Sequence, residues 1–123
     1  MKSPTDTTTL EALLRRWAEL EPERCILTGY EPYQGYSVRV KGAMQMADLL
    51  HAGDYVVQGA TQEAIERRGW MWSLDSQYMD SGVPLGLCSA IVCDEDDINE
   101  HATSDTPAAA LLSAYVQALE AQA

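Results

Sequence analysis

Hydrophobic and polar positions alternate most strictly in the segment 69–77. Large apolar residues occupy one side of an extended strand and smaller or polar residues the other: Trp70, Trp72 and Leu74 against Met71, Ser73 and Asp75. Each buried indole ring removes roughly 150 to 250 Å² from water, so the tryptophan side is predicted to face the core. We therefore expect this segment to be the central strand of the fold, with Trp72 buried.

Two other stretches carry apolar residues at helical spacing. The first follows the capping box Thr8-Thr9-Leu10-Glu11 and stops at Pro22, after a loose tail over 1–7. The second follows the Thr106-Pro107 start signal and runs to the end of the chain. The predicted inward positions of these helices are Leu10, Leu13, Leu14 and Trp17 in the first, and Leu111, Leu112, Tyr115 and Leu119 in the second.

Shorter patterns fill the rest of the chain. Strands are predicted over 24–28 and 36–41, a methionine-containing helix over 42–51, and a strand or extended connection over 54–58. Thr61 is expected to cap a helix over 62–68 that ends at Gly69. A hairpin turn over 78–84 then leads to a strand over 85–93 that pairs with the tryptophan strand, and to a polar loop over 94–105. These elements predict one α+β domain over 1–123, an antiparallel sheet of three to five strands packed by the N-terminal and C-terminal helices as a sandwich.

The charge distribution is strongly uneven along the chain. The 123 residues carry a formal charge of -11, and all eight Lys and Arg residues lie at or before position 68. The segment 69–123 has nine acids and no Lys or Arg. A field of this sign repels nucleic acid and lipid headgroups and attracts cationic partners, although acidity can also simply keep a protein soluble.

Residue types that carry catalysis are sparse. Cys25, Cys88 and Cys93 have no CxxC spacing and lie in apolar runs, so we expect three reduced, mostly buried thiols. With only His51 and His101 as histidines, a catalytic thiol pair would be a chance arrangement. No glycine-rich phosphate loop is present, and the sequence predicts a protein that is not an enzyme and holds no cofactor.

The densest polar cluster lies in the acidic stretch that follows the 85–93 strand. Its spacing does not match a calcium loop of the EF-hand kind, because Ile98 and Asn99 stand where a ligand and a glycine are needed, so no metal is expected. We interpret the cluster as a partner-binding surface. The predicted partner-binding residues are Asp94, Glu95, Asp96, Asp97 and Glu100 in the cluster, Asp75 and Asp80 near the hairpin, and Tyr30 and Tyr33 on a Gly- and Pro-rich loop.

The C-terminal half resembles a known group of small phage proteins. A GW-x-W strand (Gly69, Trp70, Trp72, Ser73), a second strand, a polar loop and a T-P-A-x-A-L helix (Thr106, Pro107, Ala108, Ala110, Leu111) occur in the order typical of the phage α-β-α sandwich family. Some phage proteins with a similar strand and terminal helix are anti-CRISPR inhibitors. The resemblance covers the C-terminal half only, and its motifs are mainly structural.

Together these features predict an acidic, non-catalytic phage-type protein of the host cytoplasm. It would inhibit a host defence complex by occupying its basic, nucleic-acid-binding surface as a DNA mimic, with no direct contact to nucleic acid or membrane. Formation of a homodimer is left open. The alternatives are an accessory protein that binds a small molecule or a metal, and a structural or oligomerising phage protein.

Overall fold

The computed structural model describes residues 10–28, 35–47, 53–78, 84–95, 99–104 and 106–122. Three helices lie in these ranges: α2 (Leu10–Leu20), α3 (Gly53–Arg67) and α4 (Pro107–Gln122). The strands form two antiparallel sheets. Sheet A has the order β1 (Cys25–Thr28), β2 (Gly35–Val40), β3 (Ala43–Ala47), and sheet B has the order β4 (Met71–Tyr78), β5 (Pro84–Cys93), β6 (Asn99–Ser104).

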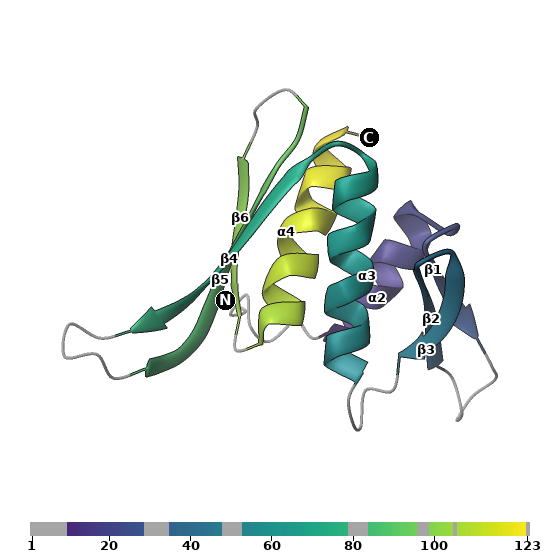
Figure 1. Ribbon diagram of the computed structural model, residues 1–123, viewed down its shortest axis with the longest axis horizontal. Helices are drawn as coiled ribbons and strands as arrows, with labels where there is room; N and C mark the ends of the chain where they lie inside the picture. Colours follow the sequence, from purple (N-terminus) through teal and green to yellow (C-terminus); the bar gives the residue numbers. More distant parts are fainter. Residues whose placement is uncertain are drawn as a thin grey trace, which may run out of the picture.

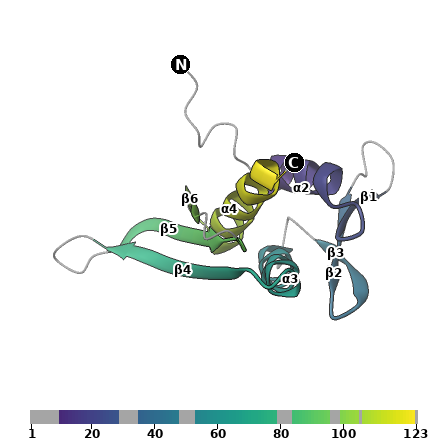
Figure 2. The same cartoon turned by 90° about the horizontal axis from the view of Figure 1, so that it is seen from above.

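The helices lie between the two sheets. In Figure 1, α4 and α3 stand side by side in the middle, with sheet B on one side and sheet A on the other. Helix α4 packs on β5 and β6, whereas α3 contacts β2 and β3, and α2 contacts β1. The β4–β5 hairpin extends away from the helices (Figure 2). The predicted α+β fold, with N-terminal and C-terminal helices against strands, is confirmed, and its strands are divided between two sheets.

Helix α4 is the centre of the core. Every residue from Ala108 to Leu119 except Gln117 is buried, including the four positions predicted to face inward. Five of the buried positions on this helix are alanines, and a small side chain lets two backbones approach closely. The Thr106 hydroxyl accepts a hydrogen bond from the Ala109 amide at 3.2 Å, which caps the helix as predicted.

A buried carboxylate ties the three helices together. Glu21, only 5 % exposed, follows α2 and accepts hydrogen bonds from Trp17 Nε1 at 2.9 Å and from the Tyr115 hydroxyl at 2.6 Å. Arg68, just after α3, adds an ion pair with Glu21, and its guanidinium carbon lies 4.9 Å from the ring centroid of Trp70. Four buried or partly buried polar groups thus satisfy one another inside the core.

The aromatic rings around this carboxylate form a second set of contacts. The Tyr115 ring meets Trp17 and Trp70 edge-on, with centroids 6.1 and 6.0 Å apart. Burial and the neighbouring Glu21 carboxylate both raise the pKa of the Tyr115 phenol. Burial acts to lower the pKa of Arg68, but its hydrogen bond to Glu21 raises the pKa overall. Tyr115 is therefore a neutral donor and Arg68 a cation throughout the physiological range.

The prediction of a helix over 42–51 is wrong. Its first part is strand β3, joined to β2 by a tight turn in which Lys41 (φ 52°) and Gly42 (φ 83°) both adopt the left-handed conformation. This turn chemistry favours a hairpin, because its twist matches that of the flanking strands. The two methionines of the segment, Met44 and Met46, lie on the same side of a strand, two residues apart.

The break predicted between 54–58 and 62–68 is also wrong, because α3 is continuous through both segments. Thr61 does not cap a helix. It lies buried within one, and its hydroxyl donates to the Val57 carbonyl at 2.7 Å. The buried positions Val57, Ala60, Thr61, Ala64 and Ile65 recur at helical spacing. Gly69, with φ 77°, ends this region in the left-handed conformation as predicted.

Sheet B departs from the prediction in its order. The tryptophan strand β4 is at an edge, and β5 is the middle strand. The polar loop expected over 94–105 contains strand β6, whose side chains alternate between exposed and buried positions. The face assignment is confirmed, since Trp70 is buried and Trp72 and Leu74 pack partly buried against the core. Trp72 is less buried than predicted, because an edge strand is covered less completely than a middle one.

Candidate functional site

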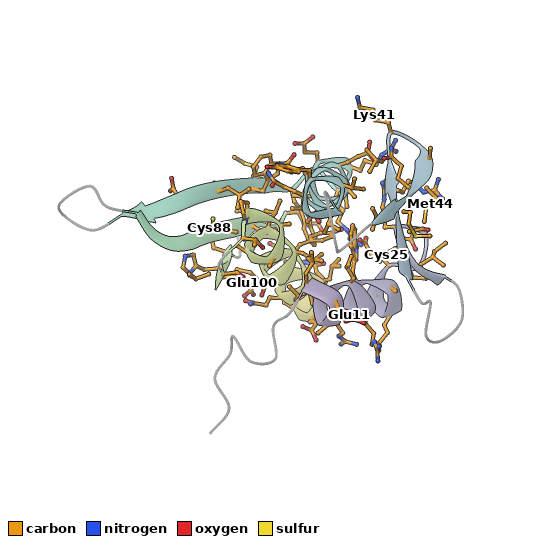
Figure 3. The ribbon with its side chains drawn as sticks, turned by 90° about the horizontal axis from the view of Figure 1, so that it is seen from below. Glu11, Cys25, Lys41, Met44, Cys88 and Glu100 are labelled. Carbon is orange, nitrogen blue, oxygen red and sulfur yellow. The ribbon has the colours of Figure 1, made fainter. Side chains whose placement is uncertain are left out.

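Acidic side chains gather where β5 ends and the chain turns towards β6. Asp94 and Glu95 follow the last residue of β5, and Glu100 lies one position into β6, opposite Val92. Glu95 is exposed and Glu100 is half-buried beside α4 (Figure 3). We call these three residues the acidic end of sheet B. Strand pairing explains how residues six positions apart in sequence come to the same end.

Asp94 differs from the solvated loop residue that the sequence predicted. It is only 4 % exposed, and its Oδ2 accepts a 3.1 Å hydrogen bond from Nε2 of Gln122 in the last turn of α4. The acidic end therefore lies against the C-terminus of α4. That helix has no basic residue in its last turn, and its unpaired carbonyls add partial negative charge at the same place.

Asp75, the other predicted site residue in the described part of the chain, does not join this cluster. Asp75 is exposed on β4, four residues from Met71, which pairs with Cys93. Four residues of strand span about 13 Å, so Asp75 is well separated from the acidic end. The remaining predicted residues lie outside the described ranges: Tyr30, Tyr33, Asp80, Asp96 and Asp97.

Several arginine side chains form ion pairs or hydrogen bonds within the protein, which the sequence did not reveal. Arg16 pairs with Glu19 and Glu120 at 3.4 and 2.9 Å, and Arg24 pairs with Glu63 at 3.4 Å. Arg68 is held by Glu21, and Arg39 donates to the carbonyls of Glu23 and Gly42 at 3.0 and 3.1 Å. None of these four cations lies on a strand of sheet B.

Glu63 illustrates how these contacts stabilise the fold. Besides pairing with Arg24, its carboxylate accepts hydrogen bonds from the Lys41 amide at 2.9 and 3.0 Å. One side chain on α3 thus fixes both the start of β1 and the β2–β3 turn. In sequence it looks like an ordinary helix-surface acid, and only the contact between α3 and sheet A reveals its role.

The three cysteines differ in burial. None of them forms a disulfide; Cys25 is buried, and Cys88 and Cys93 are half-buried, which makes the latter two more accessible than predicted. Cys25 lies between α2 and sheet A, and its thiol donates to the Leu14 carbonyl at 3.4 Å (Figure 3). Burial raises the pKa of Cys25 to about 12, so the reactive thiolate is not populated near neutral pH.

One serine–histidine pair was missed by the sequence analysis. Ser89 Oγ and His101 Nε2 are 2.7 Å apart on the face of sheet B that points away from α4. Recognising the alternation Asn99, His101, Thr103 as a strand would have revealed it. A nucleophilic serine also needs donors for the developing oxyanion. Ser89 lies on the middle strand, whose amides are engaged in pairing on both sides, so this pair acts as a surface hydrogen bond.

The described residues contain no group of three or more His, Cys, Asp or Glu side chains arranged to hold a metal ion. No helix in the described part of the chain is both long and apolar enough to cross a membrane. Neither a protein-family model nor a curated protein matches this chain.

Proposed function

We propose that this protein is a non-catalytic inhibitor that binds a basic, nucleic-acid-binding surface of a partner protein through the acidic end of sheet B. The observation that carries the proposal is the position of Asp94, Glu95 and Glu100 at the C-terminus of α4. Carboxylates there face the negative end of the helix dipole, where cations are the stabilising charges.

Glu95 and Glu100 add negative charge near the negative end of this helix, which is electrostatically unfavourable in the isolated protein and is relieved by a cationic partner. A protein that is acidic only for solubility has no need to concentrate carboxylates at a helix C-terminus. A groove that binds phosphates presents clustered Lys and Arg side chains, which attract clustered carboxylates by the same Coulombic interaction. Acids of the 94–97 run that lie outside the described residues add to the negative charge of this segment.

The resemblance to small phage proteins suggests the identity of the partner. A host defence complex of the CRISPR type holds its guide–target duplex in a positively charged channel. Occupation of such a channel by the acidic end would block access of the nucleic acid without any chemical step. More specifically, we propose that this is a phage-type protein that acts in the host cytoplasm as a DNA mimic.

The test is competition with target DNA on a panel of purified CRISPR effector complexes. Wild-type protein should reduce DNA binding by at least one effector. The variant Glu95→Gln/Glu100→Gln should weaken this effect, mainly through slower association, and the difference should shrink as salt rises. The matched control is Glu11→Gln/Glu23→Gln, which removes two acids from other parts of the surface.

The two double variants carry the same net charge, so only the position of the lost carboxylates differs. Equal weakening by both variants would mean that overall charge, not the acidic end, drives binding. Absence of competition on every effector tested would refute the proposed class of partner.

A further inference from the structure

Two sheet faces point away from the helix layer on opposite sides of the molecule. The faces of sheet A and sheet B that contact the helices carry the buried residues, whereas none of the described helices covers the opposite faces (Figure 2). We call these opposite faces the outer face of sheet A and the outer face of sheet B. Four of the large exposed apolar side chains lie on them: Ile26 and Met46 on sheet A, and Met71 and Ile91 on sheet B.

The outer face of sheet B combines an apolar centre with a negative charge. Met71 is 71 % exposed and Ile91 is 39 % exposed, and the pairing of Met71 with Cys93 makes Met71 and Ile91 diagonal neighbours. The next row along the strands contains Asp75 opposite Ser89. Among the outward side chains that the structure describes on this face, Asp75 is the one acid and His101 the one base, and Cys93 adds a thiol.

The outer face of sheet A also has apolar side chains beside a charged residue, but there the charge is positive. Ile26, Ser37 and Met46 form one row across its three strands, with Met46 61 % exposed. The next row contains Arg39 opposite Met44. The Arg39 side chain is held by the carbonyls of Glu23 and Gly42, so its cation is fixed at this face.

The spacing of apolar and charged rows agrees between the two faces. On each face, the charged residue lies one row, about 7 Å, from the apolar row. Stacking one face on the other can therefore place Ile91 over Ile26 and Met46 while Asp75 lies near Arg39. We propose that copies of this protein associate head to tail, with the outer face of sheet A of one copy against the outer face of sheet B of the next.

A hollow beside sheet A gives room for a protruding side chain. It has a volume of about 300 Å³, lies between α2 and β1, and is lined by Arg15, Ala18, Glu19, Pro22, Cys25 and Ile26. Its lining is mainly apolar, and Ile26 belongs both to the hollow and to the apolar row. The exposed Met71 of a neighbouring copy is long and flexible enough to enter such a space.

The geometry determines what kind of assembly forms. Because the two faces differ and lie on opposite sides, each copy keeps one free face after binding, which yields chains or rings and not a closed dimer. Three strands and three rows cover only about 300 Å², below the roughly 800 Å² per partner of a stable interface. Association should therefore be weak and concentration-dependent. It uses the sheet faces and not the acidic end, so it goes beyond the function proposed above.

The test measures mass by sedimentation velocity over a concentration series. Wild-type protein should form species that grow with concentration. Met46→Glu, which blocks the outer face of sheet A, and Met71→Glu, which blocks that of sheet B, should each be monomeric. An equimolar mixture of the two variants should form a 1:1 dimer that grows no further, because each variant supplies the face that the other lacks. Arg67→Gln, an exposed change with the same net charge as both variants, should behave as wild type.

Each alternative outcome contradicts the proposal in a distinct way. A variant that still dimerises alone would indicate a symmetric contact through its intact face. Wild-type protein that stays monomeric at every concentration, or variants that do not complement each other, would overturn head-to-tail association. Circular dichroism of both variants must match wild type, and Met46→Ser with Met71→Ser serves as an uncharged second pair if either Glu variant is unfolded.

Discussion

The Tyr115 hydroxyl and the Glu21 carboxylate lie 2.6 Å apart, although 94 residues separate them in the sequence. Tyr115 is in the middle of α4, and Glu21 directly follows α2. Because Arg68 and Trp17 donate to the same carboxylate, one acidic side chain joins the ends of two helices to a third. This contact makes the helix layer sensitive to single-atom changes.

Removing the Tyr115 hydroxyl should destabilise the protein without creating a large cavity. Tyr115→Phe leaves the buried Glu21 carboxylate without one donor, so we expect the free energy of unfolding to fall by about 1 to 3 kcal/mol. Urea denaturation measures the change. Tyr55→Phe is the matched control, because Tyr55 is 81 % exposed and its hydroxyl contributes little to the core. Equal stabilities of the two variants would contradict the role of this hydrogen bond.

Cys25 should make stability fall at alkaline pH. Its pKa is about 12 in the folded protein and about 8.5 in an unfolded chain, so the folded state retains a proton that the unfolded state loses. The contribution is complete below pH 8.5 and is lost as the pH rises towards 12, with a slope of up to about 1.4 kcal/mol per pH unit. Tyr115 adds a slope of the same sign only above about pH 10.

The measurement for Cys25 is the free energy of unfolding between pH 8.5 and 10. Wild type should lose stability more steeply than Cys25→Ala, whatever the difference in their absolute stabilities. If the pH profiles of wild type and Cys25→Ala were parallel, the Cys25 thiol would have the same pKa in the folded and unfolded states.

The two tryptophans of β4 should differ in their contribution to stability. Trp70 is 5 % exposed and contacts both Tyr115 and Arg68, so Trp70→Ala should cost about 3 to 5 kcal/mol. Trp72 is partly buried, and its Nε1 donates to Glu66 at 2.9 Å on the surface, so Trp72→Ala should cost about 1 to 2 kcal/mol. Thermal unfolding of both variants tests which loss is larger. A larger loss of stability in Trp72→Ala would contradict the finding that Trp70 is the more deeply buried ring.

Local patterns in the sequence predicted those elements whose periodicity is strong. The N-terminal helix, the terminal helix with its Thr106 cap, and the faces of β4 were predicted because each shows a regular apolar spacing or a clear start signal in the sequence itself. The 42–51 region was misread because methionine, leucine and alanine favour helices, whereas the Lys41-Gly42 turn determines a hairpin. Division of the strands into two sheets depends on contacts with α3 that no local pattern contains.

The candidate site was predictable only in part. The sequence located the excess of acid after residue 68, but not which carboxylates face solvent. Asp94 is buried because α4 ends beside it, and the Ser89–His101 pair exists because β6 pairs with β5. Both depend on tertiary contacts between elements that lie apart in the sequence.

The β2–β3 turn should tolerate and even favour asparagine. Lys41 has a φ of 52°, a left-handed conformation that asparagine adopts more readily than lysine. Lys41→Asn keeps the backbone amide that donates to Glu63, so we expect a gain of up to about 1 kcal/mol in the free energy of unfolding. Lys41→Val is the opposite control, since a β-branched residue is strained in this conformation. A loss of stability in Lys41→Asn, measured by urea denaturation, would argue against this turn.

Asp94 and Glu95 are neighbours at the acidic end, but we expect only Asp94 to stabilise the fold. Asp94→Ala removes the acceptor of the Gln122 side chain at the end of α4 and leaves a small buried space, so the free energy of unfolding should fall by about 1 to 3 kcal/mol. Glu95→Ala changes an exposed position and should alter stability by less than about 0.5 kcal/mol. Hydrogen exchange of the last turn of α4 should accelerate in Asp94→Ala alone, because only that variant frees the helix end. If Glu95→Ala were the more destabilising of the two, Glu95 would be a structural residue and could not serve as the accessible charge of the acidic end.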